Sequence, residues 1–449
     1  MNRKFKLVMF LIFLTGLVLT DAYASGFNIF SQGARAAAMA NAFTARASDP
    51  SAVWYNPAGL SQVEGFQIYA GGLLTLAEGK KYYSVYRNAT LAADSSLLLQ
   101  PNIYLSYKLS ERIGLGLGLN SPIGYEIEWP KTEAVEHVVF ILNELKINTT
   151  AIFPAAAFKV NNNLFLGAGV NFYFHRFSMR YHYPYDTNVL VALLSNGLVQ
   201  DVPDIVFDLS DFKTSSIGYY AGVQWKPTYG ISFGAVFRKG TPLTFDTGDV
   251  HAWEPPTPDD YVNAKLAELF IDSPQQNATV SYSTTDQFHA GIAVKPMESL
   301  ELEFDLTWTL WTKMDSIEII FREKPMFRSF WNGYFDLGGD TDFKNTVSIQ
   351  FGGEYKLNPS LAVRFGAFHH GSPLVMPSLS PAFPLAANKG FTLGIGWQYS
   401  RFQVDLAYLY KSYSELEAEN STLLRWGDPS QTYLSRRDNG LLLSTGIRF

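Results

Sequence analysis

Apolar residues alternate with small or polar residues from about residue 65 to the end of the chain. In the last ten residues, Leu441 and Leu443 fall on one face of an extended strand and Ser444 falls on the other. The segments 391–399 and 402–411 repeat this period of two. The pattern predicts strands that have one apolar and one polar face.

Fourteen segments of this kind are predicted, and their connections alternate strictly between short turns and long segments. Short periplasmic turns and long extracellular loops are typical of outer-membrane barrels. We therefore predict an all-β transmembrane fold, a barrel of about 14 antiparallel strands formed by residues 63–449. The predicted strands are 65–78, 97–109, 112–124, 147–160, 163–177, 213–226, 229–241, 277–296, 299–323, 343–356, 360–371, 388–399, 402–415 and 437–449.

The polar face of these segments favours a barrel over the alternative of a water-soluble β-sandwich. A sandwich would present Lys, Glu and Thr to solvent, whereas here glycine, serine, asparagine, glutamine and tyrosine predominate. The opposite face is continuously apolar and carries aromatic residues near strand ends, among them Trp225, Tyr229, Trp397 and Tyr399. This arrangement predicts a crowded lumen inside and lipid with aromatic girdles outside.

The two ends of the chain indicate export and insertion into the bacterial outer membrane. A basic start is followed by an apolar run over 7–19 and by Ala22-Tyr23-Ala24, which predicts a signal peptide, residues 1–24, cleaved between Ala24 and Ser25. An uncleaved N-terminal anchor is the alternative. The chain ends in an alternating strand with Phe449 as its last residue, which resembles the signal read by the barrel assembly machinery.

Composition excludes several classes of protein. The net charge of −6 gives no basic surplus for nucleic acid. The chain has no cysteine, its seven histidines lack metal spacing, and no G-x-S-x-G motif occurs. After residue 24 there is no apolar run of 18 residues, which excludes a helical membrane protein. We expect no enzyme activity, no cofactor and no metal.

Residues 25–62 precede the alternating region and are rich in alanine and other small residues. A short helix is predicted at 36–42, ending before Asp49-Pro50. The segment is too short for a domain of its own, yet it contains Phe43, Trp54 and other apolar residues that need a surface to pack on. We therefore predict that it is a small N-terminal hatch that plugs the barrel.

Five motifs follow one another along the chain. They are Ser25, Gly26 and Phe27 at the N-terminal tip; Asn56, Pro57 and Ala58 in the predicted hatch; Asn120 and Pro122 within LGLGLNSPIG (115–124); Phe237-Arg238 through Gly248; and TLWTKMDSIEI (309–319). Taken in this order, they resemble the FadL-like family of long-chain fatty acid and hydrocarbon transporters of Gram-negative outer membranes. The resemblance covers essentially the whole mature chain.

This resemblance implies passive import of hydrophobic small molecules, with long-chain fatty acids as the leading cargo. Ligand would bind first among the extracellular loops, then at a lumenal site by the hatch tip, and would leave sideways through the strand-3 region into the membrane. Outer-membrane lipid, lipopolysaccharide and the barrel assembly machinery are the expected partners, and the expected state is a monomer. One departure from the family pattern is Ala386-Ala387-Asn388, which stands where an acidic residue is often found.

The residues also suggest where cargo binds. Amphipathic segments at 133–146, 186–199 and 258–271 fall in predicted extracellular loops, where they could bind greasy ligand or pack on one another. By strand parity, Arg238 and Arg364 point into the lumen and are candidates to hold a carboxylate. Monoaromatic hydrocarbon uptake is the alternative function, and a general porin or an adhesin is a further one.

Overall fold

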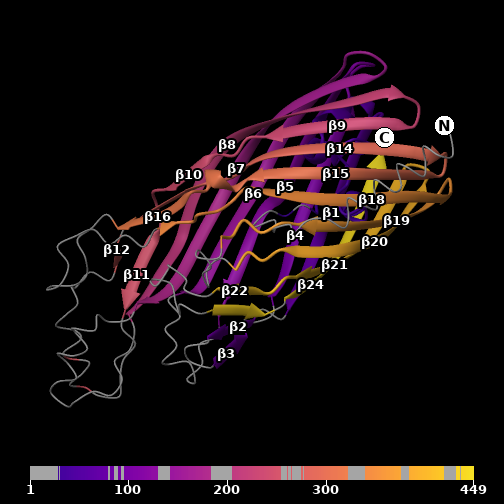
Figure 1. The fold of residues 1–449 in the computed structure, drawn as a ribbon. Coiled ribbons are helices and arrows are strands. Elements are labelled where there is room, and N and C mark those ends of the chain that lie inside the picture. Colours follow the sequence, from indigo (N-terminus) through magenta and orange to yellow (C-terminus); the bar gives the residue numbers. More distant parts are fainter. Residues whose placement is uncertain are drawn as a thin grey trace.

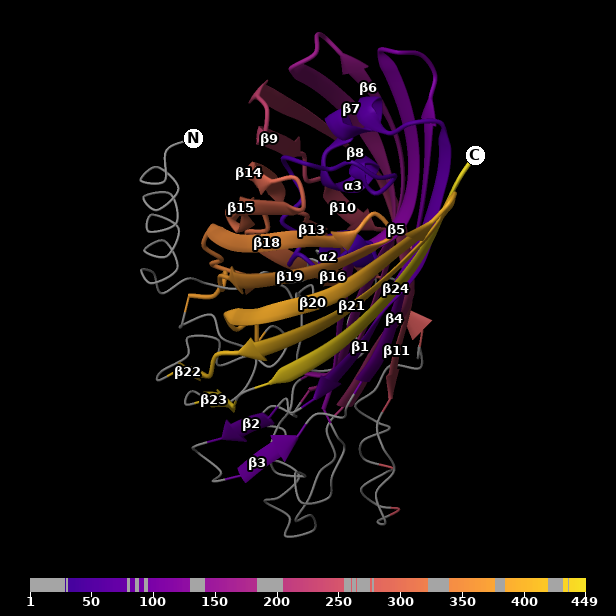
Figure 2. The same cartoon turned by 90° about the vertical axis from the view of Figure 1, so that its right-hand side faces the viewer.

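The chain forms a closed barrel that surrounds an inner N-terminal segment (Figures 1 and 2). The structure is a computed structural model, which describes residues 29, 31–78, 81–84, 89–92, 96–129, 142–183, 205–253, 260, 264, 275–276, 278–321, 339–375, 384–418, 431–434 and 436–449. The predicted signal peptide, the tip residues Ser25, Gly26 and Phe27, and the predicted loop segments 186–199 and 258–271, apart from residues 260 and 264, lie outside the described residues.

Fourteen antiparallel strands close the barrel, with β8 pairing to both β7 and β9. The predicted strand number is therefore correct. In spatial order the barrel runs β8, β7, β6, β5, β4, β1, β24, β21, β20, β19, β18, β15, β14, β9 and back to β8. The strands are β1 (Phe66–Glu78), β4 (Ser96–Lys108), β5 (Ile113–Glu128), β6 (Leu142–Lys159), β7 (Leu164–Tyr183), β8 (Ile205–Thr228), β9 (Ile231–Arg238), β14 (Asp286–Met297), β15 (Leu300–Leu310), β18 (Thr346–Asn358), β19 (Leu361–His370), β20 (Asn388–Tyr399), β21 (Phe402–Tyr413) and β24 (Arg437–Arg448).

Smaller sheets extend from the end of the barrel opposite the short turns (Figure 1). One contains β10 (Pro242–Phe245), β13 (Ala278–Ser283), β16 (Ser316–Phe321) and β17 (Gly339–Asp340). A second contains β22 (Leu416–Ala418), β23 (Gln431–Leu434), β2 (Lys81–Ser84) and β3 (Ala89–Ala92). The strands β11 (Asp249–Trp253) and β12 (Gln275–Gln276) continue the main sheet beyond β8.

Two predicted strands are wrong because the chain breaks within them. The segment 277–296 divides between β13 and β14 at residues 284–285, and 299–323 divides between β15 and β16 around a short 3₁₀ helix, η3 (Trp311–Lys313). The breaks contain neither glycine nor proline, so no turn residue in the sequence marks where the wall bends. The segment 133–146 is also wrong at its end, because residues 142–146 belong to β6.

The two faces of the wall differ as the alternation predicts. Leu441 and Leu443 expose about half of their surface to the outside, whereas Leu442 and Ser444 between and beside them are buried. The outer aromatic residues Trp225, Tyr229, Trp397 and Tyr399 are likewise exposed. The lipid-facing band is therefore built from large side chains, and the inner face from small and polar ones.

The N-terminal segment fills the barrel interior, where Figure 2 shows α2 and α3 inside the ring of strands. Its elements are α2 (Ala34–Ala37), α3 (Ala52–Tyr55) and the 3₁₀ helix η1 (Pro57–Gln62). The predicted helix at 36–42 corresponds to α2, which begins two residues earlier and ends at Ala37. It cannot continue to residue 42 because Ala40 and Asn41 adopt left-handed backbone angles. The assignment of residues 25–62 as a hatch remains a prediction, and below we call residues 31–63 the inner segment.

None of the helices among the described residues has the length and apolar character needed to cross a membrane.

Candidate functional site

The Asn56-Pro57-Ala58 turn joins the inner segment to itself and to the wall. Asn56 caps η1: its Oδ1 accepts a hydrogen bond from the Ala58 N–H at 3.1 Å, and Pro57 occupies the first helical position. The Asn56 Nδ2 donates to the Thr44 carbonyl at 2.8 Å and to the Val223 carbonyl of β8 at 3.0 Å. One buried side chain thus fixes the turn in three directions.

The wall approaches this turn through glycine. A Cβ added to Gly222 would lie 2.2 Å from Oδ1 of Asn56, and a Cβ on Gly167 would lie 2.4 Å from the Ala58 nitrogen. Neither position has room for a side chain. The inner segment therefore lies directly on the strand backbone at these points.

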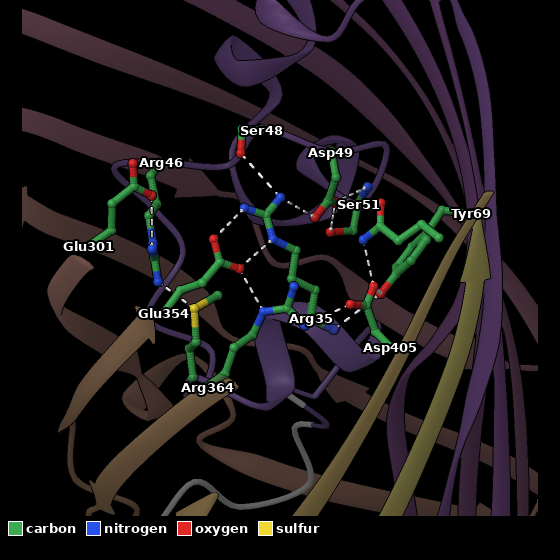
Figure 3. Close-up of polar contacts among 12 residues, drawn as sticks. Arg35, Arg46, Ser48, Asp49, Ser51, Tyr69, Glu301, Glu354, Arg364 and Asp405 are labelled. Carbon is green, nitrogen blue, oxygen red and sulfur yellow. Dashed lines mark hydrogen bonds and ion pairs between the residues drawn. The ribbon is translucent and has the colours of Figure 1, made fainter. Parts of the chain in front are cut away.

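A cluster of charged residues holds the other part of the inner segment to the wall (Figure 3). Arg35 of α2 pairs with Glu354 of β18 at 3.2 Å and with Asp49 at 3.2 Å. Arg364 of β19 bridges Glu354 and Asp405 of β21, each at 2.6 Å. We call Arg35, Asp49, Glu354, Arg364 and Asp405 the ionic cluster. Asp49, Glu354, Arg364 and Asp405 are buried and Arg35 is mostly so, and each charge therefore depends on its partners for stability.

Arg35 carries its charge at every working pH. Burial alone would lower the pKa of Arg35, but the charges of Glu354 and Asp49, helped by Asp405, raise it above its ordinary value. The ionic cluster therefore keeps its cation independently of pH.

A second set of contacts lies on β15. Asp305 accepts hydrogen bonds from the backbone N–H groups of Phe43 and Thr44, both at 3.0 Å. Glu303 accepts one from the Ala45 N–H and pairs with Arg46 at 3.0 Å. Inward-facing carboxylates of the wall thus bind a stretch of inner-segment backbone that belongs to no helix.

A pocket lies between the inner segment and the wall, where β9, β14 and β15 break. Its empty space is about 730 Å³ when the open side is counted. The apolar and aromatic part of the lining comprises Ile29, Trp54, Pro122, Ile123, Ile147, Tyr173, Tyr282, Trp311 and Met314. The polar part comprises His175, Arg238, Lys239, Ser283, Thr284, Thr285 and Gln287.

Arg238 is the buried cation of this pocket. Its guanidinium stacks on the rings of Trp54 at 3.9 Å and Tyr220 at 4.9 Å, and Nη2 donates to the Trp54 carbonyl at 2.8 Å. Nε and Nη1 have no hydrogen-bond partner, and no carboxylate among the described residues forms an ion pair with this group. Arg364, in contrast, has both of its carboxylate partners within the ionic cluster.

The wall has an incomplete seam between β4 and β5. Their pairing runs from Lys108–Gly114 to Ile103–Leu119 and stops there, although both strands continue. The pairing of β5 with β6 shifts register between Asn120 and Ile123. The N-terminal residues cover this point, since the Ile29 N–H donates to the Pro122 carbonyl at 2.9 Å.

The sequence model of the family described as outer membrane protein transport protein (OMPP1/FadL/TodX) matches residues 16–437. The chain belongs to this family. A protein of Neisseria meningitidis serogroup B, NMB0088, named only as an outer membrane protein, is 24% identical over 384 residues, 80% of this chain and 79% of that protein.

Solved structures share the fold of this FadL/TodX family member. The crystal structure of a Pseudomonas aeruginosa FadL homologue is 18% identical, with a TM-score of 0.73, over 95% of this chain and 100% of that chain. The structure of the Pseudomonas putida toluene transporter TodX is 16% identical, with a TM-score of 0.70, over 94% of this chain and 99% of that chain. These likenesses support the closed 14-stranded barrel.

The structure of this FadL/TodX family member does not bring the other ligand-binding residues predicted from the sequence together in one site. Asn120 and Pro122 lie at the seam, Arg238 in the pocket and Arg364 in the ionic cluster. His175 and His289 bond to wall hydroxyl groups of Thr149, Ser216 and Thr307. Among the described residues, no group of three His, Asp or Glu side chains could hold a metal ion.

Sequence reasoning missed three members of the ionic cluster: Arg35, Asp49 and Glu354. Glu354 could have been found by parity, because it continues the inward face of Gln350 and Gly352 in β18. No pattern in the sequence pairs it with Arg35, 319 residues away. The pocket residue Trp54 was recognised only as an apolar residue that needs a packing surface.

Proposed function

We propose that this protein imports hydrophobic small molecules across the outer membrane without an energy source, and that long-chain fatty acids are its main cargo. The observation that carries this proposal is Arg238, a buried guanidinium whose Nε and Nη1 have no hydrogen-bond partner among the described residues, in a pocket with a largely apolar and aromatic lining. A fatty acid combines an anionic carboxylate with an apolar chain. The carboxylate would bind the Arg238 guanidinium, and the chain would pack on the apolar part of the lining.

In the proposed route, cargo binds among the extracellular loops, reaches the pocket beside the inner segment, and leaves between β4 and β5 into the membrane. Ile29 lines the pocket and its N–H also bonds Pro122, so the N-terminal residues cover both the site and the seam. We propose that the tip, Ser25, Gly26 and Phe27, is displaced as cargo arrives. Lateral exit spares the chain any contact with periplasmic water.

Monoaromatic hydrocarbon uptake is the second candidate function. The aromatic lining of Trp54, Tyr173, Tyr282 and Trp311 suits a flat ring without a head group. The solved structures of similar fold include toluene transporters, one of them from Pseudomonas putida. A general porin or an adhesin has less support, because the inner segment fills the barrel interior.

The test replaces Arg238 with glutamine and measures initial-rate uptake of labelled oleate and of labelled toluene. The host cells lack their own transporter, and Arg112→Gln in a short exposed turn is the matched control. We expect oleate uptake at limiting concentration to fall roughly tenfold, since a hydrogen-bonded ion pair is lost. Toluene uptake should stay unchanged, which shows that the barrel and inner segment are intact.

Other results redirect the proposal. Unchanged oleate uptake in Arg238→Gln would remove Arg238 from the route. Uptake of toluene alone by the unaltered protein would establish the hydrocarbon function. Uptake of neither compound would contradict import of hydrophobic cargo altogether.

A further inference from the structure

Two asparagines face each other where the pairing of β4 and β5 ends. The last pair is Ile103 with Leu119, and the same register carried one step further places Asn102 opposite Asn120. Beyond this point β4 stays paired to β1 and β5 stays paired to β6, but not to each other. The two amides thus lie at the first position where the wall is open.

Both side chains are fully buried, and three of their four amide atoms have no hydrogen-bond partner among the described residues. Neither amide atom of Asn102 has a partner among the described residues, and Oδ1 of Asn120 has none. Asn120 Nδ2 donates to the Tyr104 hydroxyl group at a long 3.3 Å. Burying an amide without partners in an apolar environment is unfavourable, because its hydrogen bonds to water are not replaced. Asn171 carries the same cost within the paired wall, so it is the position of Asn102 and Asn120 at the open seam that points to a ligand.

The polar character continues along the inner face of β4. Oε1 of Gln100, two residues further along the unpaired part of β4, also lacks a partner among the described residues. Gln100 reaches across the seam, since its Nε2 lies 3.4 Å from where a Cβ on Gly124 would be. The edge of the open seam is therefore lined with uncharged hydrogen-bonding groups, while Pro122 and Ile123 beside it also line the pocket of Arg238.

We infer that Asn102 and Asn120 form a binding site for the polar head group of a single-chain amphiphile as it crosses the seam. This inference rests on the proposed function and adds a second station to it. An amide offers a donor and an acceptor, which matches a carboxylic acid or an alcohol group. Because the site carries no charge, it suits the neutral form of the head, whereas Arg238 suits the carboxylate.

The site resolves a problem of the lateral route. The hydrocarbon chain of the cargo moves favourably into lipid. Its polar head group, however, loses its hydrogen bonds to water in the gap before it reaches the membrane surface. Two amides at the edge of the gap replace that water for the head group. They act as specificity-determining residues, because a hydrocarbon gains nothing from them.

The test uses Asn102→Leu and Asn120→Leu, which remove the amides at nearly constant volume. Asn171→Leu is the matched control, because Asn171 of β7 is equally buried and both of its amide atoms also lack partners, but it pairs with Gly218 inside the intact wall. Initial-rate uptake of oleate, oleyl alcohol and 1-heptadecene is measured in cells, and equilibrium binding of oleate is measured on purified protein.

We expect the two seam variants to take up oleate and oleyl alcohol about tenfold more slowly, with oleate binding to the purified protein retained. Heptadecene uptake and the Asn171→Leu variant should match the unaltered protein. Unchanged oleate uptake, or an equal fall for heptadecene, would overturn the inference, because the amides would then serve only the wall or hold only water. Failure of the unaltered protein to take up oleate would instead contradict the proposed function, and the inference with it.

Discussion

Asn56 shows how single residues set the position of the inner segment. Its three hydrogen bonds and the bare backbone at Gly222 form one contact, in which a polar side chain meets a strand without a side chain between them. Sequence alone predicts a rigid turn at Asn56-Pro57-Ala58 from the chemistry of asparagine and proline. It cannot predict the partner, because glycine at 222 is one of many in the wall.

Gly222→Ala is expected to destabilise this contact. The new methyl group would lie 2.2 Å from Oδ1 of Asn56, so the turn or the strand must shift, at a cost of about 1–3 kcal/mol. Gly72→Ala is the matched control, because its nearest atom would be 3.4 Å away. The free energy of unfolding in detergent and oleate uptake measure the effect. Equal stability of the two variants would contradict the close approach.

The two arginines illustrate the limit of residue-scale prediction. Strand parity places both Arg238 and Arg364 in the lumen and cannot rank them as ligand anchors. The distinction comes from partners: carboxylates of β18 and β21 occupy Arg364, whereas Arg238 has aromatic rings and free N–H groups. Such ion pairs depend on which strands lie next to one another in the barrel. The local sequence pattern of a strand does not predict its neighbours.

At the scale of elements, the inner segment is held in two different ways. Residues 35–46 are bound by carboxylates of β15 and β18. Helices α3 and η1 pack mainly through small and apolar side chains on β4 to β8, and the Asn56 side chain adds a hydrogen bond to β8. Buried ion pairs are costly to separate, whereas apolar contacts can slide. We therefore expect the charged half to stay fixed while cargo passes.

Arg35→Met tests the ionic cluster. The change leaves Asp49 without its cation and is expected to destabilise the protein by roughly 3–5 kcal/mol. Lys108→Met is the matched control, since its partner Glu64 is largely exposed and such a pair contributes less than about 1 kcal/mol. Thermal unfolding and the sensitivity of cells to large antibiotics are measured. Similar behaviour of both variants would show that the cluster does not hold the inner segment.

The strands themselves were the most predictable elements, and their breaks the least. Alternation locates a strand wherever one face meets lipid, because the physical demand on each residue is local. The bends at 284–285 and around η3 arise where neighbouring strands β9, β14 and β15 turn away together. These bends depend on several strands at once and not on the local sequence of any one of them. The pocket forms where they occur, so the sequence alone could not predict it.

At the scale of the whole molecule, we expect cargo binding to change the rate of amide hydrogen exchange in the N-terminal residues that cover the seam, and to leave it unchanged in the residues bound to carboxylates of the wall. With saturating oleate, we expect faster amide exchange at Ile29, whose N–H bonds the seam at Pro122, and across 121–124. The N–H groups of Phe43, Thr44 and Ala45, bound to carboxylates of β15, should remain protected. Mass spectrometry of peptides from both regions measures this. A uniform change along 29–62 would contradict the division.

The ionic cluster also bears on the order in which this protein assembles. Glu354, the wall partner of Arg35, is made 319 residues later, and Ala34 donates its N–H to Ser444, a separation of 410 residues. Until β18 is in place, Arg35 has only Asp49 as a partner, and its burial would be less favourable. We therefore expect the inner segment, although it is synthesised before the wall, to take its final position only after the wall strands have formed.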